Sequence, residues 1–462
     1  MKKENKQFIF SKYLDKQFGS SIFSYNQIIS MLIPLILDTF FISLIGMLTT
    51  AMISSSSQES VSAVSLVGPL YMMIYAVYTA ISAGGTVIVA QYLGKGDMER
   101  VKKTAGQLLF ATPLSAIISA AILIILSDSL VNFLFKGVDI AVLAKTKSYL
   151  IGVAISMVFL SVYMSGFAVF RGLGETKKCL KLTILINLIH FVGSFIFINV
   201  MKLDILGSTL ALNIARFVGG AVSVYMLINP KSTVHIGIKH ILKIDKNILY
   251  QIFRIGIPFG MEQLFMNGGS MIVQIYIAQL GTISVAANAV GSSAISLIYA
   301  AASAVSTLAV TIIGQCIGFG DKKLAKWYGK KMILLGTFMI VISLIIMLPC
   351  MNGILWLYKA PADTLSIIYK LIIIVSIFMP FFWSIANIMP SVMRAAGDAS
   401  FCSYFSLFTM WLVRVGLGYV TAIPLGFGLI GVWFCMCVEW VIKTIVYWNR
   451  YKSEIWLNQK TV

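Results

Sequence analysis

The chain has 462 residues, of which 59% are hydrophobic and only 11% are charged, and its mean hydropathy is +0.91. This composition excludes an ordinary soluble globular protein and indicates a polytopic membrane protein. The net charge of +19 could suggest a nucleic-acid partner, but the basic residues are spread over short loops beside apolar segments. We therefore expect contact with anionic membrane lipid and no nucleic acid.

The N-terminal stretch up to Ser20 is polar and basic, and the apolar run that follows it is too long for a signal peptide, so we expect this run to remain as a helix. Twelve segments are long and apolar enough to cross a bilayer. They cover roughly residues 27–53, 61–92, 104–127, 148–170, 180–201, 205–228, 248–280, 285–317, 330–351, 364–393, 400–424 and 427–449. The expected fold is an all-α protein with twelve transmembrane helices.

The loops between these segments differ in charge from one side of the membrane to the other. One side carries 27 Lys and Arg residues and the other carries 6. Because basic loops stay on the cytoplasmic side, we expect both termini to be cytoplasmic and the protein to lie in the plasma or inner membrane.

The sequence contains an internal repeat. The stretch "AQYLGKGD" at 90–97 returns as "GQCIGFGD" at 314–321, and "FRGLGET" at 170–176 returns as "MRAAGDA" at 393–399. The offsets of these two pairs are 224 and 223, and Pro34 matches Pro258 at 224. We therefore predict two homologous six-helix lobes, residues 1–228 and 248–462, joined by a cytoplasmic linker at 229–247. Because six is an even number, the lobes should be related by a pseudo-two-fold axis along the membrane normal.

An acid occurs at the same place in the first helix of each lobe, Asp38 in the first and Glu262 in the second. A charge in the middle of a membrane costs about 2.5 to 3.5 kcal/mol, so such residues usually line a cavity and mark an ion or substrate path. We predict that the two acids couple ions and line one substrate cavity. The alternative is that each neutralises an intramembrane cation, for which Arg216, Arg414 and Lys443 are available.

Other intramembrane polar and aromatic residues are harder to assign. Arg414 and Glu439 are expected to form a structural ion pair between the last two helices. Asn267 and Asn288 are candidates to line the cavity. His190 is either a proton carrier or a histidine whose hydrogen bonds are satisfied by a neighbouring helix.

Two tryptophans lie deep in predicted helices, Trp383 and Trp411. Their flat faces could bind a cationic aromatic compound, and packing in the protein core is the alternative.

The repeated loop motifs have a local structural explanation. Gly94, Gly96, Gly318 and Gly320 allow the left-handed turns that end a helix, and Asp97 and Asp321 can cap the next helix. The "GKGD" motif lacks the spacing of a phosphate loop, so we expect no nucleotide. Arg171 and Arg394 are expected to satisfy helix carbonyls or to bind lipid phosphate. The six cysteines have no metal-site or disulfide spacing.

The two half-repeats, the motifs "GKGD" and "GFGD", the motifs "RGLGETK" and "RAAGDAS", and the stretch "LGTISVAANAV" resemble the multidrug and toxic compound extrusion (MATE) family. The resemblance extends from about residue 28 to 450. It implies an exporter with two lobes around a central cleft, which moves organic compounds outward against an inward flow of sodium ions or protons. It implies no cofactor besides the coupling ion, and we expect a monomer.

One residue departs from the family pattern. Members commonly carry an aspartate on the first helix in a motif resembling "VDT", where this chain has "MLTT" with Thr49 in that position. A threonine can ligate a cation but cannot carry a proton. We predict that Thr49 takes part in ion coupling with Asp38 and Glu262, and that a sodium ion, if used, binds at one of these acids.

The predicted function is secondary active multidrug efflux of lipophilic organic cations, by antiport with protons or sodium ions and alternating access of the two lobes. One alternative is a lipid-linked oligosaccharide flippase, which would favour a cationic cavity. A second is a membrane-embedded enzyme, which would need an ordered catalytic cluster that the sequence lacks. We therefore expect no enzymatic activity.

Overall fold

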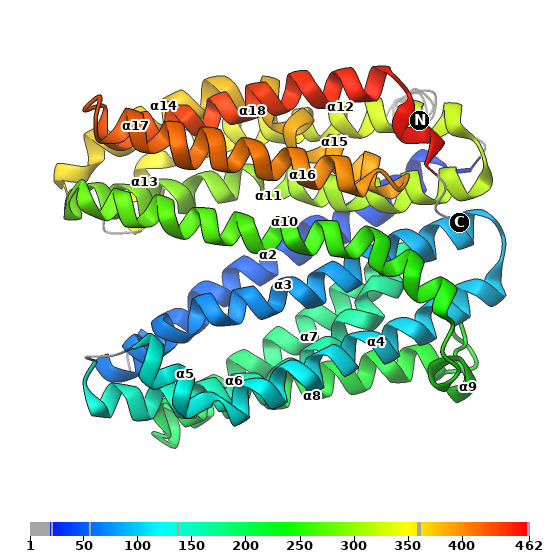
Figure 1. The fold of residues 1–462 in the computed structure, drawn as a ribbon, viewed down its shortest axis with the longest axis horizontal. Helices are drawn as coiled ribbons and strands as arrows, with labels where there is room; N and C mark the ends of the chain where they lie inside the picture. The colour runs from blue at the N-terminus through cyan, green and yellow to red at the C-terminus, as the bar shows by residue number, and fades with distance from the viewer. Residues whose placement is uncertain (1–18, 20–21, 55–56, 136–137, 358–361, 460–462) are drawn as a thin grey trace, which may run out of the picture. The chain divides into compact units, whose positions relative to one another are not determined.

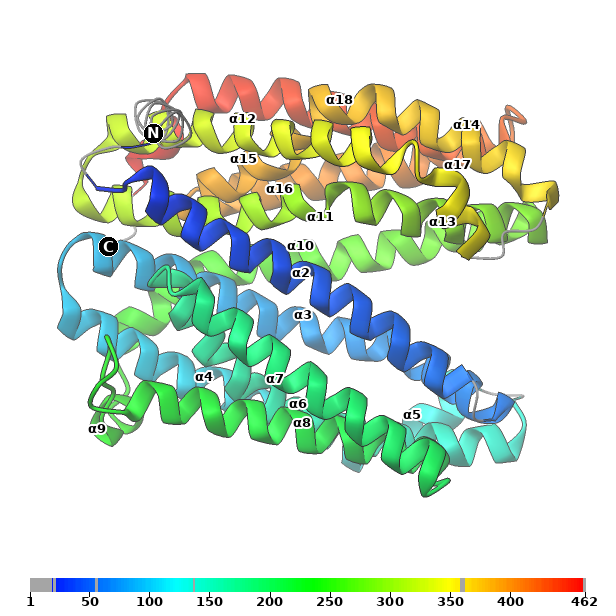
Figure 2. The same ribbon diagram turned by 180° about the vertical axis from the view of Figure 1, so that it is seen from behind.

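The structure is a computed structural model that describes residues 19, 22–54, 57–135, 138–357 and 362–459. These residues form helices joined by turns, with no strand among them (Figures 1 and 2). The all-α prediction is confirmed. Each of the twelve predicted segments coincides with one long helix or with a chain of consecutive helices.

The first six segments and the linker, with the helix that opens the second repeat, form ten elements. They are α2 (Tyr25–Ser54), α3 (Gln58–Gly94), α4 (Met98–Ile125), α5 (Ser127–Leu134), α6 (Ile140–Gly172), α7 (Thr176–Ser194), η1 (Phe195–Val200), α8 (Asp204–Ile228), α9 (Ile238–Leu242) and α10 (Lys246–Gln279).

The remaining elements complete the second repeat. They are α11 (Thr282–Phe319), α12 (Lys322–Met347), α13 (Met351–Leu357), α14 (Ala362–Phe378), η2 (Met379–Trp383), α15 (Ser384–Ala395), α16 (Ala399–Thr409), η3 (Met410–Leu417), α17 (Gly418–Ala422), α18 (Gly428–Lys452) and η4 (Ile455–Asn458). The first residues of the short helices α5 and α13 are related by the offset of the sequence repeat.

In the described part of the chain, 11 helical stretches are long and apolar enough to cross a membrane. Helix α10, the seventh predicted segment, is not among them. Its polar residues Glu262, Gln263, Asn267 and Gln274 lower the hydropathy of every window that contains them.

The chain forms two compact units, and the borders between them lie inside helices. Among the described residues, the N-terminal unit comprises residues 37–260, and the C-terminal unit comprises those up to 36 and those from 261 to 459. The two borders fall in α2 and in α10 and are related by the repeat offset. The predicted lobes 1–228 and 248–462 with a linker at 229–247 describe the sequence repeat, and this division stays a prediction.

The N-terminal unit is built around α6, which packs against α3, α4 and α8, while α7 packs against α8. The first part of α10 belongs to this unit and approaches α3 closely. A Cβ atom added to Gly84 of α3 would lie 2.2 Å from the carbonyl oxygen of Ile252. Small residues thus bring the two backbones together, as is common between membrane helices.

The linker residues are held against the same unit. Gln107 of α4 donates from Nε2 to the carbonyl oxygens of His240 and Lys243, at 3.2 and 2.9 Å, and accepts from the backbone N–H of Asp245 at 3.1 Å. Thr233 donates to the carboxylate of Glu175 at 2.6 Å. Residues 233–245 therefore have fixed contacts with the N-terminal unit.

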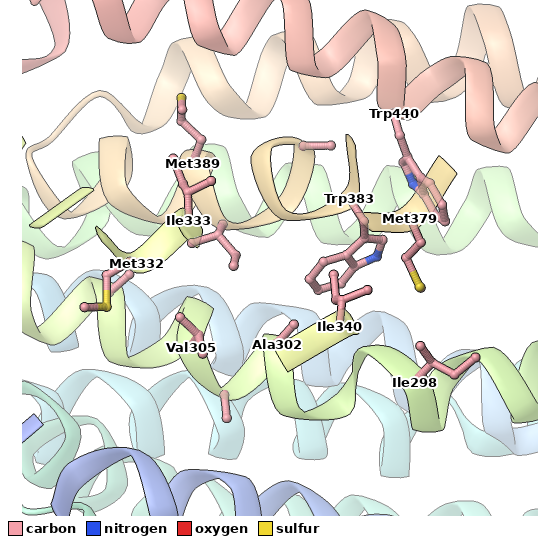
Figure 3. Close-up of a cluster of buried hydrophobic side chains, with 14 of the residues drawn as sticks. Ile298, Ala302, Val305, Met332, Ile333, Ile340, Met379, Trp383, Met389 and Trp440 are labelled. Carbon is pink, nitrogen blue, oxygen red and sulfur yellow. The ribbon is translucent and has the colours of Figure 1, made fainter. Parts of the chain in front are cut away.

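The C-terminal unit has a continuous apolar core, with α11 packed against α12, α14 and α15, and α15 against α18. Figure 3 shows part of this core, where the ring of Trp383 lies among the side chains of Ile340, Met379 and Trp440.

The loop motifs behave as predicted at their second glycines and their aspartates. Gly96 and Gly320 have φ of 77° and 90°, in the left-handed region. Asp97 accepts from the backbone N–H of Arg100 at 3.0 Å, and Asp321 caps α12 in the same way. The first glycine of each motif stays in helical conformation.

Candidate ion-coupling and substrate sites

Asp38 is buried in α2 and faces an arginine of the same unit. Its side chain is 3% exposed, and its Oδ2 lies 3.4 Å from a terminal guanidinium nitrogen of Arg171, in the last turn of α6. The guanidinium also stacks over the Phe167 ring, 4.2 Å from the ring centroid. The other carboxylate oxygen, Oδ1, is buried and has no close hydrogen-bond partner among the described residues, although the side chain of Thr183 in α7 lies near the carboxylate. One oxygen of Asp38 therefore holds a cation while the other is available.

Glu262 has the equivalent arrangement in the C-terminal unit. Its side chain is 8% exposed, and its Oε2 accepts from a terminal nitrogen of Arg394 at 2.5 Å and from the hydroxyl of Ser403 at 2.8 Å. Arg394 stands in the last turn of α15. A charge-assisted hydrogen bond of this length is among the stronger polar contacts in proteins.

The two pairs are related by the sequence repeat, because the acids match at an offset of 224 and the arginines at 223. The guanidinium groups of Arg171 and Arg394 both pair with the acids, which was not expected from the sequence. Their contacts with helix carbonyls or lipid phosphate stay predictions. Each acid does neutralise a cation, but the partner is none of Arg216, Arg414 and Lys443. The signal was present in the sequence, because both arginines open the repeated motifs "RGLGET" and "RAAGDA".

A third buried acid holds two cations. Glu439 of α18 is fully buried, with Oε2 at 2.6 Å from Nε of Arg414 in η3 and Oε1 at 2.6 Å from Nζ of Lys443. The pair of Arg414 and Glu439 expected from the sequence is thus present, with Lys443 as a third member. Two cations share one carboxylate, so the cluster keeps a net positive charge.

Comparison with known proteins identifies the family of this chain. A family model described as MatE matches residues 34–196 and again residues 258–420. Both the starts and the ends of the two matches are related by the offset of the repeat. The chain belongs to the MatE family.

Several relatives resemble the chain along nearly its whole length. An uncharacterized transporter of Bacillus subtilis, YisQ, is 25% identical over 98% of this chain and 99% of its own. A probable multidrug resistance protein of Thermotoga maritima, NorM, is 22% identical over 97% of this chain and 96% of its own.

Solved structures agree on the fold. A transporter of the MOP superfamily from Pyrococcus furiosus matches with a TM-score of 0.83 and 18% identity, over 94% of this chain and 96% of its own. A MATE transporter of Vibrio cholerae matches with a TM-score of 0.79 and 21% identity, over 94% and 98% of the two chains.

This MATE protein is therefore a multi-pass membrane transporter and not an enzyme, and its family transports small molecules without a cofactor.

Two residues predicted to line the substrate cavity lie in the C-terminal unit. Asn288 is 6% exposed, and its Oδ1 accepts from Nε1 of Trp433 at 2.9 Å. Asn267 is half-buried in α10. The hydrogen bond from Trp433 uses the side-chain oxygen of Asn288 inside the protein core. That Asn288 and Asn267 line a substrate cavity stays a prediction.

The two candidate aromatic residues differ in environment. Trp383 is 6% exposed and stacks on Tyr299 with ring centroids 5.3 Å apart. Trp411 is 38% exposed and meets Phe265 edge-on at 6.4 Å. The core packing of Trp383 favours a structural role, whereas the exposed face of Trp411 remains accessible. Their binding of substrate stays a prediction.

The remaining candidates are Thr49 and His190. Thr49 lies in α2, but its side chain is outside the part of the chain that the structure describes. His190 of α7 is half-buried and within electrostatic range of Arg216. The role of His190 as a proton carrier stays a prediction. In the described residues no group of three or more His, Cys, Asp or Glu could hold a metal ion, and a sodium site at Asp38 or Glu262 stays a prediction.

Proposed function

We propose that this MATE protein is a secondary active exporter of lipophilic organic cations in the plasma membrane, with both termini in the cytoplasm, and that it works by antiport with protons or sodium ions. The observation that carries the proposal is the pair of repeat-related carboxylates, Asp38 and Glu262, each buried and each held by an arginine. Buried carboxylates in membrane helices are typical of ion and substrate paths.

In this mechanism three kinds of cation compete for one carboxylate. The arginine holds the acid when no ligand is present, a cationic substrate displaces it from the inside, and a proton or sodium ion arriving from outside neutralises the acid. The substrate then loses its counter-charge and leaves outward. Binding is reciprocal, so the ion and the substrate must weaken each other by the same factor.

Alternating access follows from the two homologous halves. We propose that the two lobes rock as near-rigid bodies, so that the acids face one side of the membrane at a time. A cavity shared by Asp38 and Glu262 is part of this proposal.

We favour protons as the coupling ion. Among the described residues Oδ1 of Asp38 has no close hydrogen-bond partner, so this oxygen can accept a proton. A hard cation requires several oxygen ligands, and the position where relatives carry a further acid is occupied by Thr49.

The test is efflux of a fluorescent lipophilic monocation from proteoliposomes, driven in turn by a proton gradient and by a sodium gradient. We expect efflux with the proton gradient, and we expect Asp38→Asn and Glu262→Gln each to lower its rate at least tenfold while the protein still elutes as a folded species. The control is Asp128→Asn, because the Asp128 side chain is 70% exposed in its ion pair with Lys147. Wild-type efflux by either acid variant would remove that acid from the mechanism.

The flippase alternative is favoured by one observation, an excess of buried positive charge. Besides the two acid–arginine pairs, the described membrane helices hold Arg216 and the cluster of Arg414, Lys443 and Glu439. Preferential binding of anions in place of cations, with no competition by the monocation, would put this alternative ahead.

A further inference from the structure

The N-terminal unit buries a cation without an acid beside it. Arg216 stands near the middle of α8 and is 9% exposed. Its terminal nitrogens donate to the hydroxyl of Ser156 at 2.6 Å and to the hydroxyl of Tyr71 at 2.9 Å. Both partners are neutral, and none of the ion pairs formed by the described residues includes Arg216.

Such a charge is expensive unless something compensates it. An arginine at the centre of a membrane helix costs about 2.5 to 3.5 kcal/mol, and such residues usually pair with an opposite charge or face a water-filled path. The C-terminal unit provides a carboxylate at the related place. Glu439 matches Ala215, the neighbour of Arg216, at the repeat offset, and it holds Arg414 and Lys443. Among the described residues of the N-terminal unit, no carboxylate pairs with Arg216, whereas the C-terminal unit has Glu439 at the related place.

Hydrogen-bond donors remain available around Arg216. The Ser156 hydroxyl donates to the carbonyl oxygen of Val153 at 2.8 Å, so it serves Arg216 only as an acceptor. Tyr71 accepts from Arg216, which leaves its own O–H to donate. A guanidinium carries five N–H donors, and two hydrogen bonds do not use them all. The Tyr71 hydroxyl lies 2.9 Å from one terminal nitrogen of Arg216, so the two groups are close enough to contact one anion together.

An aromatic surface lies beside these donors. The Tyr71 ring is 5.4 Å from the guanidinium carbon of Arg216, and it stacks on Tyr75 with centroids 5.7 Å apart and an angle of 19° between the ring planes. Both tyrosines are only half-buried, whereas nearby Tyr78 is fully buried and bonded to Ser119. The Tyr71 and Tyr75 rings thus keep accessible surface next to a buried positive charge.

We propose that Arg216 and Tyr71 form a binding site for the carboxylate of an aromatic organic acid. The planar guanidinium fork matches a carboxylate with two parallel hydrogen bonds, the Tyr71 hydroxyl donates a third, and the Tyr71 and Tyr75 rings contact the aromatic part of the ligand. A lipid headgroup fits less well, because Arg216 lies midway along α8 and lipid phosphates lie at the membrane surface. The site lies within the N-terminal unit and goes beyond the proposed exchange, since it uses neither Asp38 nor Glu262.

The experiment measures benzoate binding to the purified full-length protein in phosphatidylcholine nanodiscs, by calorimetry and by the benzoate-dependent rise in melting temperature. Benzamide, an uncharged analogue of the same shape, serves as the ligand control. We expect benzoate to bind and benzamide not to bind. We expect Arg216→Gln to weaken benzoate binding at least tenfold, and Tyr71→Phe, which keeps the ring, to weaken it several-fold.

The matched protein control is Arg254→Gln, the same substitution at an exposed arginine of α10, which should leave benzoate affinity unchanged. Benzoate binding is measured without any ion gradient, so a failure of the antiport proposal would not affect this result. The proposal is overturned if wild type does not bind benzoate, or if Arg216→Gln binds it as well as wild type.

Two further outcomes are decisive. If Arg216→Gln does not fold, the benzoate affinity of Tyr71→Phe tests the proposal. An affinity equal to that of wild type would contradict the proposed site. If phosphatidylglycerol in the nanodiscs abolishes benzoate binding in wild type, the site holds lipid phosphate and the organic-acid proposal is overturned.

Discussion

At the residue scale, the buried acids matter because they cannot stay uncompensated. Glu262 is held by Arg394 and Ser403, and Asp38 by Arg171. Removing one partner of a buried ion pair leaves the other charge buried without compensation. This lowers the stability of the protein far more than replacing both partners does. Replacing the arginine alone should therefore lower the stability of the protein, and replacing both partners should lower it less.

We predict that Arg394→Gln lowers the free energy of unfolding by about 3 to 5 kcal/mol, because it leaves the Glu262 carboxylate buried without its cation. The double variant Arg394→Gln with Glu262→Gln should recover much of this loss. Thermal unfolding of the purified variants, combined in a double-mutant cycle, measures the coupling. The control is Arg100→Gln, whose exposed ion pair with Asp97 should contribute no more than about 1 kcal/mol. Wild-type stability of Arg394→Gln would contradict the buried ion pair.

At the element scale, the first part of α10 docks on α3 through residues without bulky side chains. Gly84 faces the carbonyl oxygen of Ile252, and Cβ atoms added to Gly256 and Gly260 would each lie 2.7 Å from atoms of Ala80. The hydroxyl of Tyr92 at the end of α3 donates to Gln251 at 2.8 Å. These contacts explain why the start of a second-repeat helix belongs to the N-terminal unit.

We predict that Gly84→Ala destabilises the protein by about 1 to 3 kcal/mol, because the added methyl group must displace the backbone of α10. Gly68→Ala on the same helix is the matched control, since a Cβ atom there meets nothing within 4 Å. Melting temperatures of the two variants in detergent provide the comparison. Equal melting temperatures would show that α3 and α10 do not approach as closely as described.

At the scale of the whole molecule, the charge of the loops predicts the orientation in the membrane. Helix α12 begins with a cluster of lysines that should be cytoplasmic, so the turn that follows it should face outward. Cys350 lies in this turn and is exposed, whereas the other cysteines are buried. The chain therefore carries one natural reporter of its topology.

A membrane-impermeant maleimide added to intact cells should label Cys350. Labelling should disappear in Cys350→Ser, which is the control for reaction at the buried cysteines. Gel shift or mass spectrometry of the purified protein measures the label. Reaction that requires permeabilised cells would reverse the predicted orientation and place the termini outside.

The sequence by itself determined the features that depend on local composition. Long apolar segments predict membrane helices because the bilayer fixes their length, and the glycine and aspartate motifs predict helix ends because a left-handed turn and a cap involve neighbouring residues. The internal offset of 224 also identified Asp38 and Glu262 as equivalent residues, since repeated patterns are visible without a structure.

Only the tertiary structure decided which charges meet. Asp38 and Arg171 are 133 residues apart in the chain, and Glu262 and Arg394 are 132 apart. Whether such side chains touch depends on how the helices pack and which way each side chain points along its helix, and composition does not encode this. The same holds for Arg216, whose lack of an acidic partner became evident only when its neighbours proved to be Ser156 and Tyr71.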